Sequence, residues 1–155
     1  MSHPSAKNIR AKDLMTTKVH TLSASDSIGY AVDWMLAKGH SGAPVVDEHR
    51  KLLGVLSEYD CLEALRRTVT EWTPEDRVSS YMTKEVATVS PETPVYDLCA
   101  RFSEMCWRRV VVVDDQQRVV GLVSRRDLMK ALRDEVYRKP GSNTYDLIEK
   151  QRLSC

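Results

Sequence analysis

The chain has 155 residues, of which 42% are hydrophobic and 29% are charged, and its formal net charge at pH 7 is +1. This size and composition are those of a small soluble globular protein, and so small a net charge provides no overall attraction to nucleic acid or to an anionic membrane. The longest apolar runs have about five residues, far fewer than the roughly twenty that a membrane-spanning helix needs.

The cysteines and the beginning of the chain indicate where the protein works. Residues 1–7 lack the apolar core of a secretory signal. The four cysteines form no C-x-x-C pair and have no spacing with histidine that suits zinc. We expect them to be small hydrophobic core residues, with Cys99 and Cys106 on one helix face. We therefore expect a cytoplasmic protein without a disulfide framework and without a metal site.

In chain order, the first half of the sequence predicts two helices and three extended segments. The elements are an extended segment (19–22), a helix (27–38), a strand (43–46), a polar turn (47–51), a strand (52–56) and a helix from Glu58. The first helix is predicted by apolar residues at helical spacing. Ser25 or Asp26 is its expected N-cap, because short polar side chains can accept a hydrogen bond from a free backbone N–H group there.

The second half predicts the same order of elements. They are an extended segment (86–89), a helix capped by Thr93 with Pro94 at its first position, a strand (109–113), a polar turn (114–118), a strand (119–123) and a helix from Arg125. Proline is favoured at the first helical position, where no N–H group is needed. The tail after Arg138 is expected to begin as a loop, and 145–153 are expected to form a last short helix.

The two halves are one unit repeated in tandem. When Met15 is aligned with Met82, the following segments also match without a gap: Met15-Thr16 with Met82-Thr83, Val45-Val46-Asp47 with Val112-Val113-Asp114, and Gly54-x-x-Ser57-x-x-Asp60 with Gly121-x-x-Ser124-x-x-Asp127. A unit of about 55 residues is only marginally stable alone, so we expect the two to share a core. The predicted fold is α/β (α+β), with two tandem β-α-β-β-α repeats packed as a pseudo-twofold pair. The predicted domains are 8–67 and 78–135, joined by a linker (68–77) and followed by a tail (136–155).

A repeated unit that carries M-T, V-V-D and G-h-h-S-x-x-D, where h is hydrophobic, resembles the CBS domain family, and the tandem pair resembles a Bateman module. The likeness extends over about residues 10–135. It implies a regulatory or sensor module that binds AMP, ADP, ATP or another adenosyl compound between its repeats and signals to a partner protein that remains to be named. Family members usually form homodimers, and no other cofactor is required.

The S-x-x-D motif has a structural and a functional interpretation. Ser57 ends a strand and opens a helix, so Ser57 and Asp60 are placed to form a capping box. A helix N-terminus also carries a partial positive charge and free N–H groups. A carboxylate there can accept hydrogen bonds from both hydroxyls of a ribose, which is its role in the family. Ser57, Asp60, Ser124 and Asp127 are therefore the candidate ribose-binding residues, and capping is compatible with that role.

The resemblance also implies an adenine pocket and a phosphate site. The candidate adenine-pocket residues are Val19, His20, Pro44, Val86, Ala87 and Val111. For the phosphate, Arg108 occupies a position that contacts phosphate in the gamma subunit of AMP-activated protein kinase, although Val111 replaces the usual proline. Arg125 and Arg126 lie at a helix start, where a cation opposes the helix dipole, which hints at a bound anion. The alternative is that these arginines are solvated surface residues.

The two copies differ at the positions that would contact phosphate. The first copy has Ser41, Glu58 and Tyr59 where the second has Arg108, Arg125 and Arg126. We therefore expect two unequal clefts, and the acidic first motif favours a less charged ligand such as a nucleoside or S-adenosylmethionine. A cleft that combined Arg108 with Asp127 would suit phosphate best. Whether these two residues share a cleft depends on how the repeats cross.

Other functions have less support in the sequence. The histidines have no evident nucleophile or metal partners, and the glycine-rich loops that bind nucleotide phosphates in many enzymes are missing. No catalytic activity is therefore expected. Arginine pairs are offset by acidic residues, so nucleic acid is not an expected partner. A nucleotide-independent interaction or dimerisation module is the alternative function.

Overall fold

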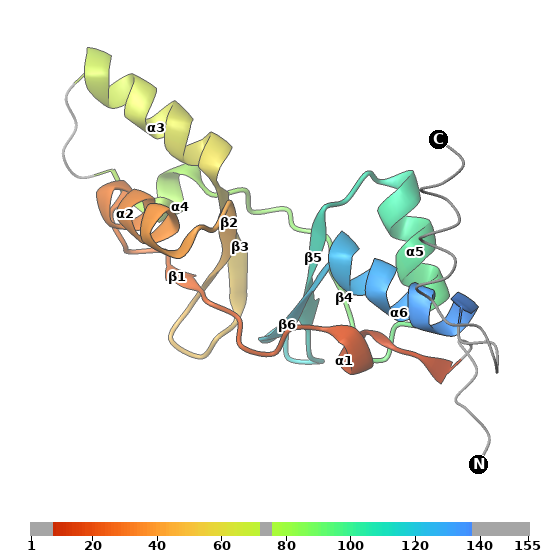
Figure 1. Cartoon of the computed structure of the whole chain (residues 1–155). Helices are drawn as coiled ribbons and strands as arrows, with labels where there is room; N and C mark the ends of the chain where they lie inside the picture. Colours follow the sequence, from red (N-terminus) through yellow and green to blue (C-terminus); the bar gives the residue numbers. More distant parts are fainter. Residues whose placement is uncertain (1–7, 72–75, 138–155) are drawn as a thin grey trace, which may run out of the picture.

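The structure, a computed structural model, describes residues 8–71 and 76–137 and contains two three-stranded sheets, one from each copy of the repeat (Figure 1). The first copy contains α1 (Ala11–Leu14), β1 (Leu22–Ser23), α2 (Ile28–Lys38), β2 (Gly42–Val46), β3 (Leu52–Ser57) and α3 (Glu58–Thr70). The second contains α4 (Val78–Tyr81), β4 (Thr88–Val89), α5 (Val95–Glu104), β5 (Arg109–Val113), β6 (Val119–Ser124) and α6 (Arg125–Tyr137). The predicted class and the repeated order of elements are confirmed.

Each sheet has the same topology, with a parallel first pair of strands and an antiparallel second pair. The central strands β2 and β5 are buried along nearly their whole length, from Ala43 to Val46 and from Val110 to Val113. Helices cover one face of each sheet, and the other face is turned toward the opposite repeat (Figure 1). This double burial explains why both strands are continuous apolar runs and do not alternate with polar residues.

The cap of α2 differs from the prediction. Ser27 is the N-cap, because its hydroxyl oxygen accepts a hydrogen bond from the backbone N–H group of Tyr30 at 3.1 Å. The predicted alternatives, Ser25 and Asp26, lie before the helix. The Asp26 carboxylate accepts a hydrogen bond from the backbone N–H group of Ser23 at 2.8 Å and so stabilises the preceding turn.

Two predictions about α5 are wrong by small shifts. Pro94 is the N-cap and not the first helical residue, while the Thr93 hydroxyl stabilises the turn before it. The helix ends at Glu104, so Cys106 lies beyond it, exposed and in a left-handed conformation with φ of 52°. Cys106 therefore does not share a helix face with Cys99 and is not a core residue.

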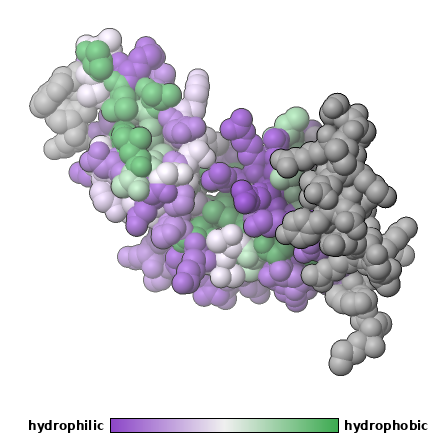
Figure 2. Space-filling view, viewed as in Figure 1, coloured by the Kyte–Doolittle hydropathy of each residue, from purple (hydrophilic) through white to green (hydrophobic). Residues whose placement is uncertain are grey.

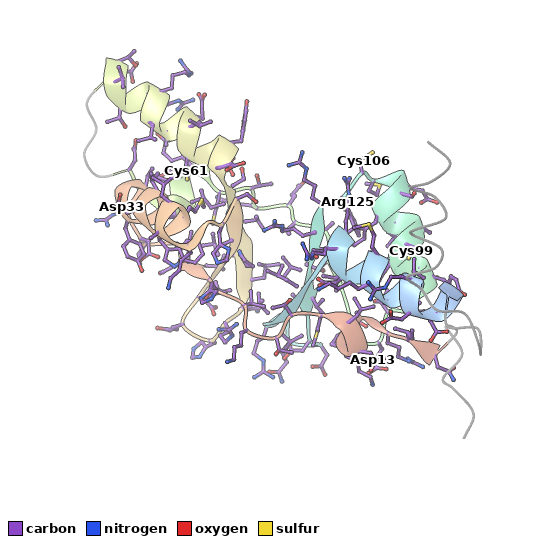
Figure 3. The ribbon with its side chains drawn as sticks, viewed as in Figure 1. Asp13, Asp33, Cys61, Cys99, Cys106 and Arg125 are labelled. Atoms are coloured by element: carbon purple, nitrogen blue, oxygen red, sulfur yellow. The ribbon has the colours of Figure 1, made fainter. Side chains whose placement is uncertain are left out.

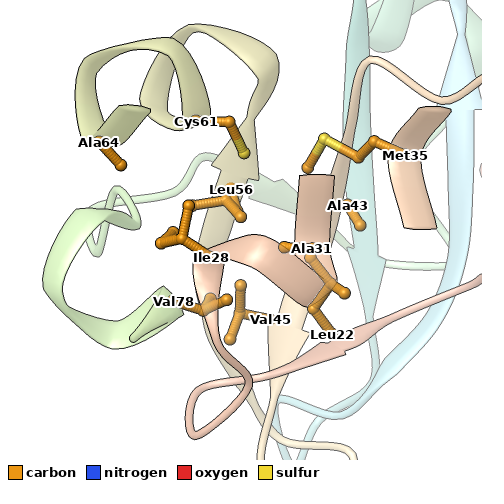
Figure 4. Packing of buried hydrophobic residues seen from close by; sticks show 10 residues of the cluster. All are labelled: Leu22, Ile28, Ala31, Met35, Ala43, Val45, Leu56, Cys61, Ala64 and Val78. Atoms are coloured by element: carbon orange, nitrogen blue, oxygen red, sulfur yellow. The ribbon is translucent and has the colours of Figure 1, made fainter. Parts of the chain in front are cut away.

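The short helices α1 and α4, which the sequence did not predict, are exchanged between the repeats. Ala11 of α1 is fully buried in the core of the second repeat, beside residues such as Val95 and Leu98. Val78 of α4 is equally buried in the core of the first repeat, where it packs near Ile28 (Figure 4). Each hydrophobic core is thus completed by a short helix that belongs, in the sequence, to the other repeat.

The Met-Thr pairs that follow these helices also cross to the opposite sheet. Thr16 forms a bridge with Leu122 of β6 through two backbone hydrogen bonds of 2.9 and 3.0 Å. Thr83 forms the equivalent bridge with Val55 of β3, with both hydrogen bonds at 2.9 Å. The repeated M-T motif therefore joins the two sheets.

The glycine of each G-h-h-S-x-x-D motif makes this crossing sterically feasible. A β-carbon on Gly54 would lie 2.7 Å from the backbone oxygen of Thr83. A β-carbon on Gly121 would collide with the side chain of Met15. Only a residue without a side chain allows the Met-Thr segment to approach the strand so closely.

A third apolar cluster fills the space between the two sheets. Its buried members are Val19, Val46, Val111, Val113 and Val119. The two hairpins meet at the same seam, where the Leu52 N–H group donates to the Gln117 carbonyl at 3.0 Å. The two repeats are therefore joined by a buried apolar interface in addition to their own cores.

The predicted boundaries of the linker and the tail can be compared with the structure only in part. Helix α3 continues to Thr70, into the segment expected to be linker. Residues 72–75 and the tail after residue 137, including the helix expected at 145–153, lie outside the described residues.

We predict that Gly54→Ala lowers the free energy of unfolding by about 1–3 kcal/mol, because the added methyl group overpacks the contact with the backbone of Thr83. Gly29→Ala is the matched control. Its β-carbon would have no neighbour closer than the Ser27 hydroxyl at 3.9 Å, and alanine is the better helix former by roughly 1 kcal/mol. Urea denaturation measures both, and equal stability of Gly54→Ala and the wild type would contradict the steric argument.

Candidate functional site

Two clefts lie between the repeats, and each takes its walls from both. The larger has a volume of about 520 Å³ and lies between β2, the start of α3 and the segment from Trp107 to Val111. The smaller has a volume of about 240 Å³ and lies between the segment from Thr16 to His20, the end of α2 and the start of α6. Ligand sites are commonly of about 300–1,000 Å³, so the larger cleft has the usual size.

Both S-x-x-D motifs form the predicted caps with nearly identical geometry. In each, the backbone N–H group and the hydroxyl of the serine donate to the same carboxylate oxygen, Oδ2 of Asp60 or of Asp127, at 2.8 Å. The aspartate N–H group donates back to the serine hydroxyl, at 3.3 Å for Ser57 and 3.2 Å for Ser124. Among the described residues, nothing hydrogen-bonds to either Oδ1 atom. Capping therefore uses one oxygen of each carboxylate and leaves the other available.

The candidate ribose-binding residues are divided between the clefts. Ser57 lines the larger cleft, and Ser124 and Asp127 line the smaller one. Asp60 is half-buried in the first turn of α3 and lines neither cleft. The second motif is therefore the one that presents its carboxylate to a cavity.

The candidate adenine-pocket residues are divided in the same way. Pro44, Val86, Ala87 and Val111 line the larger cleft, while Val19 and His20 line the smaller one. The division follows from the crossing of the repeats, because the extended segment before each sheet lies against the opposite repeat. Each cleft thus combines the first extended segment of one copy with the S-x-x-D motif of the other.

The three candidate phosphate-binding arginines are not brought together. Arg108 lines the larger cleft, whereas Arg125 and Arg126 line neither. The Arg125 guanidinium donates to the backbone oxygens of Cys106, at 3.0 Å, and of Trp107, and so fastens the turn between α5 and β5 to the start of α6 (Figure 3). Arg108 and Asp127, whose relation the sequence left open, lie in different clefts.

Several cleft residues were missed by the sequence analysis. In the larger cleft they include Glu85, Trp107 and Arg109, and in the smaller Lys18, Trp34, His40 and again Arg109. Most of them directly neighbour a predicted residue, so widening each prediction by one position would have found them. Trp34 carries no local signal, because a tryptophan within a helix is usually a core residue.

Three aromatic rings meet at the smaller cleft. The centroids of Trp34 and His40 are 5.1 Å apart, those of His20 and His40 are 5.5 Å apart, and those of His20 and Trp34 are 6.2 Å apart. Burial lowers the pKa of His40, and the nearby charges of His20, Arg109 and Lys38 lower it further. His40 is therefore held toward its neutral form.

Other kinds of site lack support in the described part of the chain. No group of histidine, cysteine, aspartate and glutamate side chains there could hold a metal ion. Among residues 8–71 and 76–137, none of the helices has the length and apolar character that crossing a bilayer requires. Burial raises the pKa of the Cys61 and Cys99 thiols, which disfavours the reactive thiolate.

The chain resembles curated proteins over most of its length. It is 29% identical over 128 residues to an uncharacterized protein of Methanocaldococcus jannaschii, and 29% identical over 119 residues to the L-aspartate semialdehyde sulfurtransferase of the same organism. The matches cover 83% and 77% of this chain. They cover only 41% and 22% of those proteins, so each relative contains much that this chain does not match.

Two solved structures match most of this chain and nearly the whole of their own chains. The complex of CBSX2 with AMP has a TM-score of 0.69 and 27% identity, over 79% of this chain and 95% of that one. The CBS domain pair of protein MJ0100, in complex with methylthioadenosine and S-adenosyl-L-methionine, has a TM-score of 0.67 and 28% identity, over 80% and 95%. Both are pairs with the same architecture.

The family model gives the same result. The model of the CBS domain matches residues 11–67 and again 78–134, which together are most of the chain. The two matches fall on the two copies of the repeat and include both S-x-x-D motifs. The chain therefore belongs to the CBS domain family and contains a tandem pair of CBS domains.

Proposed function

We propose that this chain is a regulatory module that binds adenosine-containing ligands in the clefts between its repeats and signals the binding of these ligands to another protein. The observation that carries the proposal is the carboxylate of Asp127, which lines a cleft while its Oδ1 atom has no hydrogen-bond partner among the described residues. Such an oxygen can accept charge-assisted hydrogen bonds from ribose hydroxyls. The solved relatives that hold AMP or adenosyl compounds support this ligand class.

In the larger cleft we assign the adenine to an apolar slot and the phosphate to an arginine. Pro44, Val86, Ala87 and Val111 line this cleft and offer the apolar walls that a flat base requires. Arg108 also lines it and takes part in no side-chain hydrogen bond or ion pair with the described residues. A free guanidinium can bind two phosphate oxygens at once.

The ribose contacts follow from the two caps. In the smaller cleft they are Ser124 and Asp127, with Val19 and His20 as the neighbouring wall. In the larger cleft the equivalent pair is Ser57 and Asp60, of which Ser57 lines the cavity.

Signalling follows from the shared walls of the clefts. A ligand that contacts both repeats favours the arrangement in which its contacts are formed, and so shifts the balance between arrangements. No catalytic group is needed for this, and none is proposed. The activities of the relatives belong to proteins of which this chain matches only a part, so none of those activities is assigned to it.

A second candidate function, assembly without nucleotide, is favoured by exposed apolar side chains on the helices. On α3, Tyr59 is 75% exposed, Leu62 65% and Val69 88%, and they follow one face of the helix. Hydrophobic residues gather over this helix in Figure 2. Helices α2 and α5 expose Leu36 and Tyr96 as well. Contiguous apolar surface of this kind is typical of a protein contact.

We predict that Asp127→Ala weakens the binding of AMP and of adenosine alike by about 1.5–3 kcal/mol, because it removes charge-assisted hydrogen bonds to the ribose. Loss of the cap should also lower stability by about 1 kcal/mol. Asp60→Ala loses an equivalent cap but not a carboxylate that lines a cleft, so its effect on affinity should be smaller. Calorimetry on the folded variants separates the two effects. Unchanged affinity in both variants would refute ribose binding by these residues.

We predict that Arg108→Ala weakens AMP binding at the larger cleft by about tenfold, with much less effect on adenosine, because the lost interaction is with phosphate. The loss should shrink at high salt, which screens the attraction. Trp107 lines the larger cleft and Trp34 the smaller, so Trp107 fluorescence in a background in which Trp34 and Trp72, the other two tryptophans, are both replaced by Phe reports this site. Arg126→Ala is the control, since Arg126 lines neither cleft. Equal losses for AMP and adenosine would show that Arg108 supports the fold instead.

We predict that the protein is a homodimer in solution, because dimerisation would cover the apolar faces of α2 and α5. Leu36, which is 78% exposed on α2, is the most informative position. Leu36→Glu should shift the mass measured by light scattering toward that of the monomer, and Val69→Glu tests α3 in the same way. A monomer mass for the wild type at micromolar concentration would reject the prediction.

A further inference from the structure

The smaller cleft contains a histidine pair that the proposed function does not use as a charged group. His20 comes from the segment before β1, Trp34 from α2 and His40 from the turn after α2, and all three line the cleft together with Asp127. The histidine rings are 5.5 Å apart at an angle of 39°. Two imidazoles so close cannot both be charged without mutual repulsion unless an anion lies near them.

The fixed charges around this pair favour an anion. Lys18 and Arg109 line the cleft, and neither side chain forms a hydrogen bond or an ion pair with the described residues. Lys38 at the end of α2 adds to the positive field at His40. Among the described residues, Asp127 is the one carboxylate that lines the cleft, and its Oδ2 atom already accepts two hydrogen bonds from Ser124.

The larger cleft provides the contrast. Arg109 lines both clefts, so the difference in fixed charge comes from the other residues. In the larger cleft these are the cation Arg108 and the carboxylates of Glu58 and Glu85, whereas among the described residues of the smaller cleft they are Lys18 and Asp127. The smaller cleft is therefore the more attractive of the two to a dianion, even when both histidines are neutral.

The lowered pKa of His40 sets the sign of the coupling to pH. The causes that lower the pKa of His40 are burial and neighbouring positive charge. A bound phosphate would place negative charge beside His40 and offset the neighbouring positive charge. The pKa of His40 would then rise. A ligand that raises a pKa takes up protons when it binds, so its affinity rises as the pH falls through the range between the free and bound values.

From this geometry we propose that the smaller cleft is a phosphate subsite, in which a phosphate-bearing adenosyl ligand binds against Lys18, Arg109 and the His20–His40 pair, and that the pair takes up a proton from solvent on binding. The proposal rests on the proposed function, because it takes the adenosyl class of ligand from it. It adds that occupancy of one cleft responds to pH near neutrality, where histidine ordinarily titrates, at about 6.5.

The test is calorimetry of AMP and adenosine at about pH 7 in buffers of different ionisation enthalpy, which counts the protons exchanged. A phosphate monoester has its second pKa near 6, so AMP itself can only release protons on entering a cationic site. Net uptake must then come from the protein. We expect an uptake of roughly half a proton per AMP, no uptake with adenosine, and a rise in AMP affinity of a few-fold as the pH falls from about 7.5 to about 6.5.

Variants test whether His20 and His40 are the groups that take up the proton. The double variant His20→Gln and His40→Gln should lose the uptake, and so should Asp127→Asn, because it weakens binding in the same cleft. His49→Gln is the matched control, since His49 is exposed beside Glu48 and lines neither cleft. Should the double variant be unstable, the ring NMR signals of His20 and His40 in the wild type provide the second readout. They should move toward the protonated form when AMP is added.

The outcomes separate this inference from the proposed function. If AMP and adenosine both bind and AMP binding takes up no proton, or if uptake persists in the double variant, the histidine pair is ordinary aromatic packing and the inference is overturned while the function stands. If neither compound binds the wild type, the proposed function fails, and the inference fails with it.

Discussion

The close approach of each Met-Thr segment to the glycine of the opposite repeat is the constraint on which the rest of the structure depends. Because Gly54 and Gly121 have no side chain, Thr83 and Met15 reach the opposite strand and hold the two sheets at a fixed distance. The valine cluster fills the middle of the interface at that distance, and the clefts are the space that it leaves. The stability of the pair and the shape of its clefts therefore have a common origin.

The same crossing decides the chemistry of each cleft. The larger cleft combines the first S-x-x-D motif with the arginines of the second repeat, and the smaller combines the second motif with Lys18, His20 and His40 of the first. Each cleft therefore contains charged residues from both copies, so the charge difference between the copies does not become the same charge difference between the clefts. The acidic first motif faces Arg108, and the carboxylate of Asp127 faces the histidines.

The sequence predicted what local patterns can encode. The strands were correct to within one residue of β2, β3, β5 and β6, because buried valine runs with polar turns between them have few alternative structures. The four-residue helices α1 and α4 were missed, because they are too short for a helical period and their apolar residues pack in the opposite repeat. The structural role of Arg125 could not be predicted from the sequence either, because its partners are backbone oxygens that only the folded turn brings within hydrogen-bond distance.

The pairing of Thr16 with Leu122 also restricts the order in which the protein can assemble during its synthesis. Helix α1 leaves the ribosome before any other described element, yet the strand that receives Thr16 and the core that buries Ala11 belong to the second repeat. Contacts between distant parts of a chain form late, after local structure is present. The N-terminal segment must therefore wait, with its apolar residues uncovered, until β6 has been made, and a nascent chain stopped earlier would present that segment to chaperones.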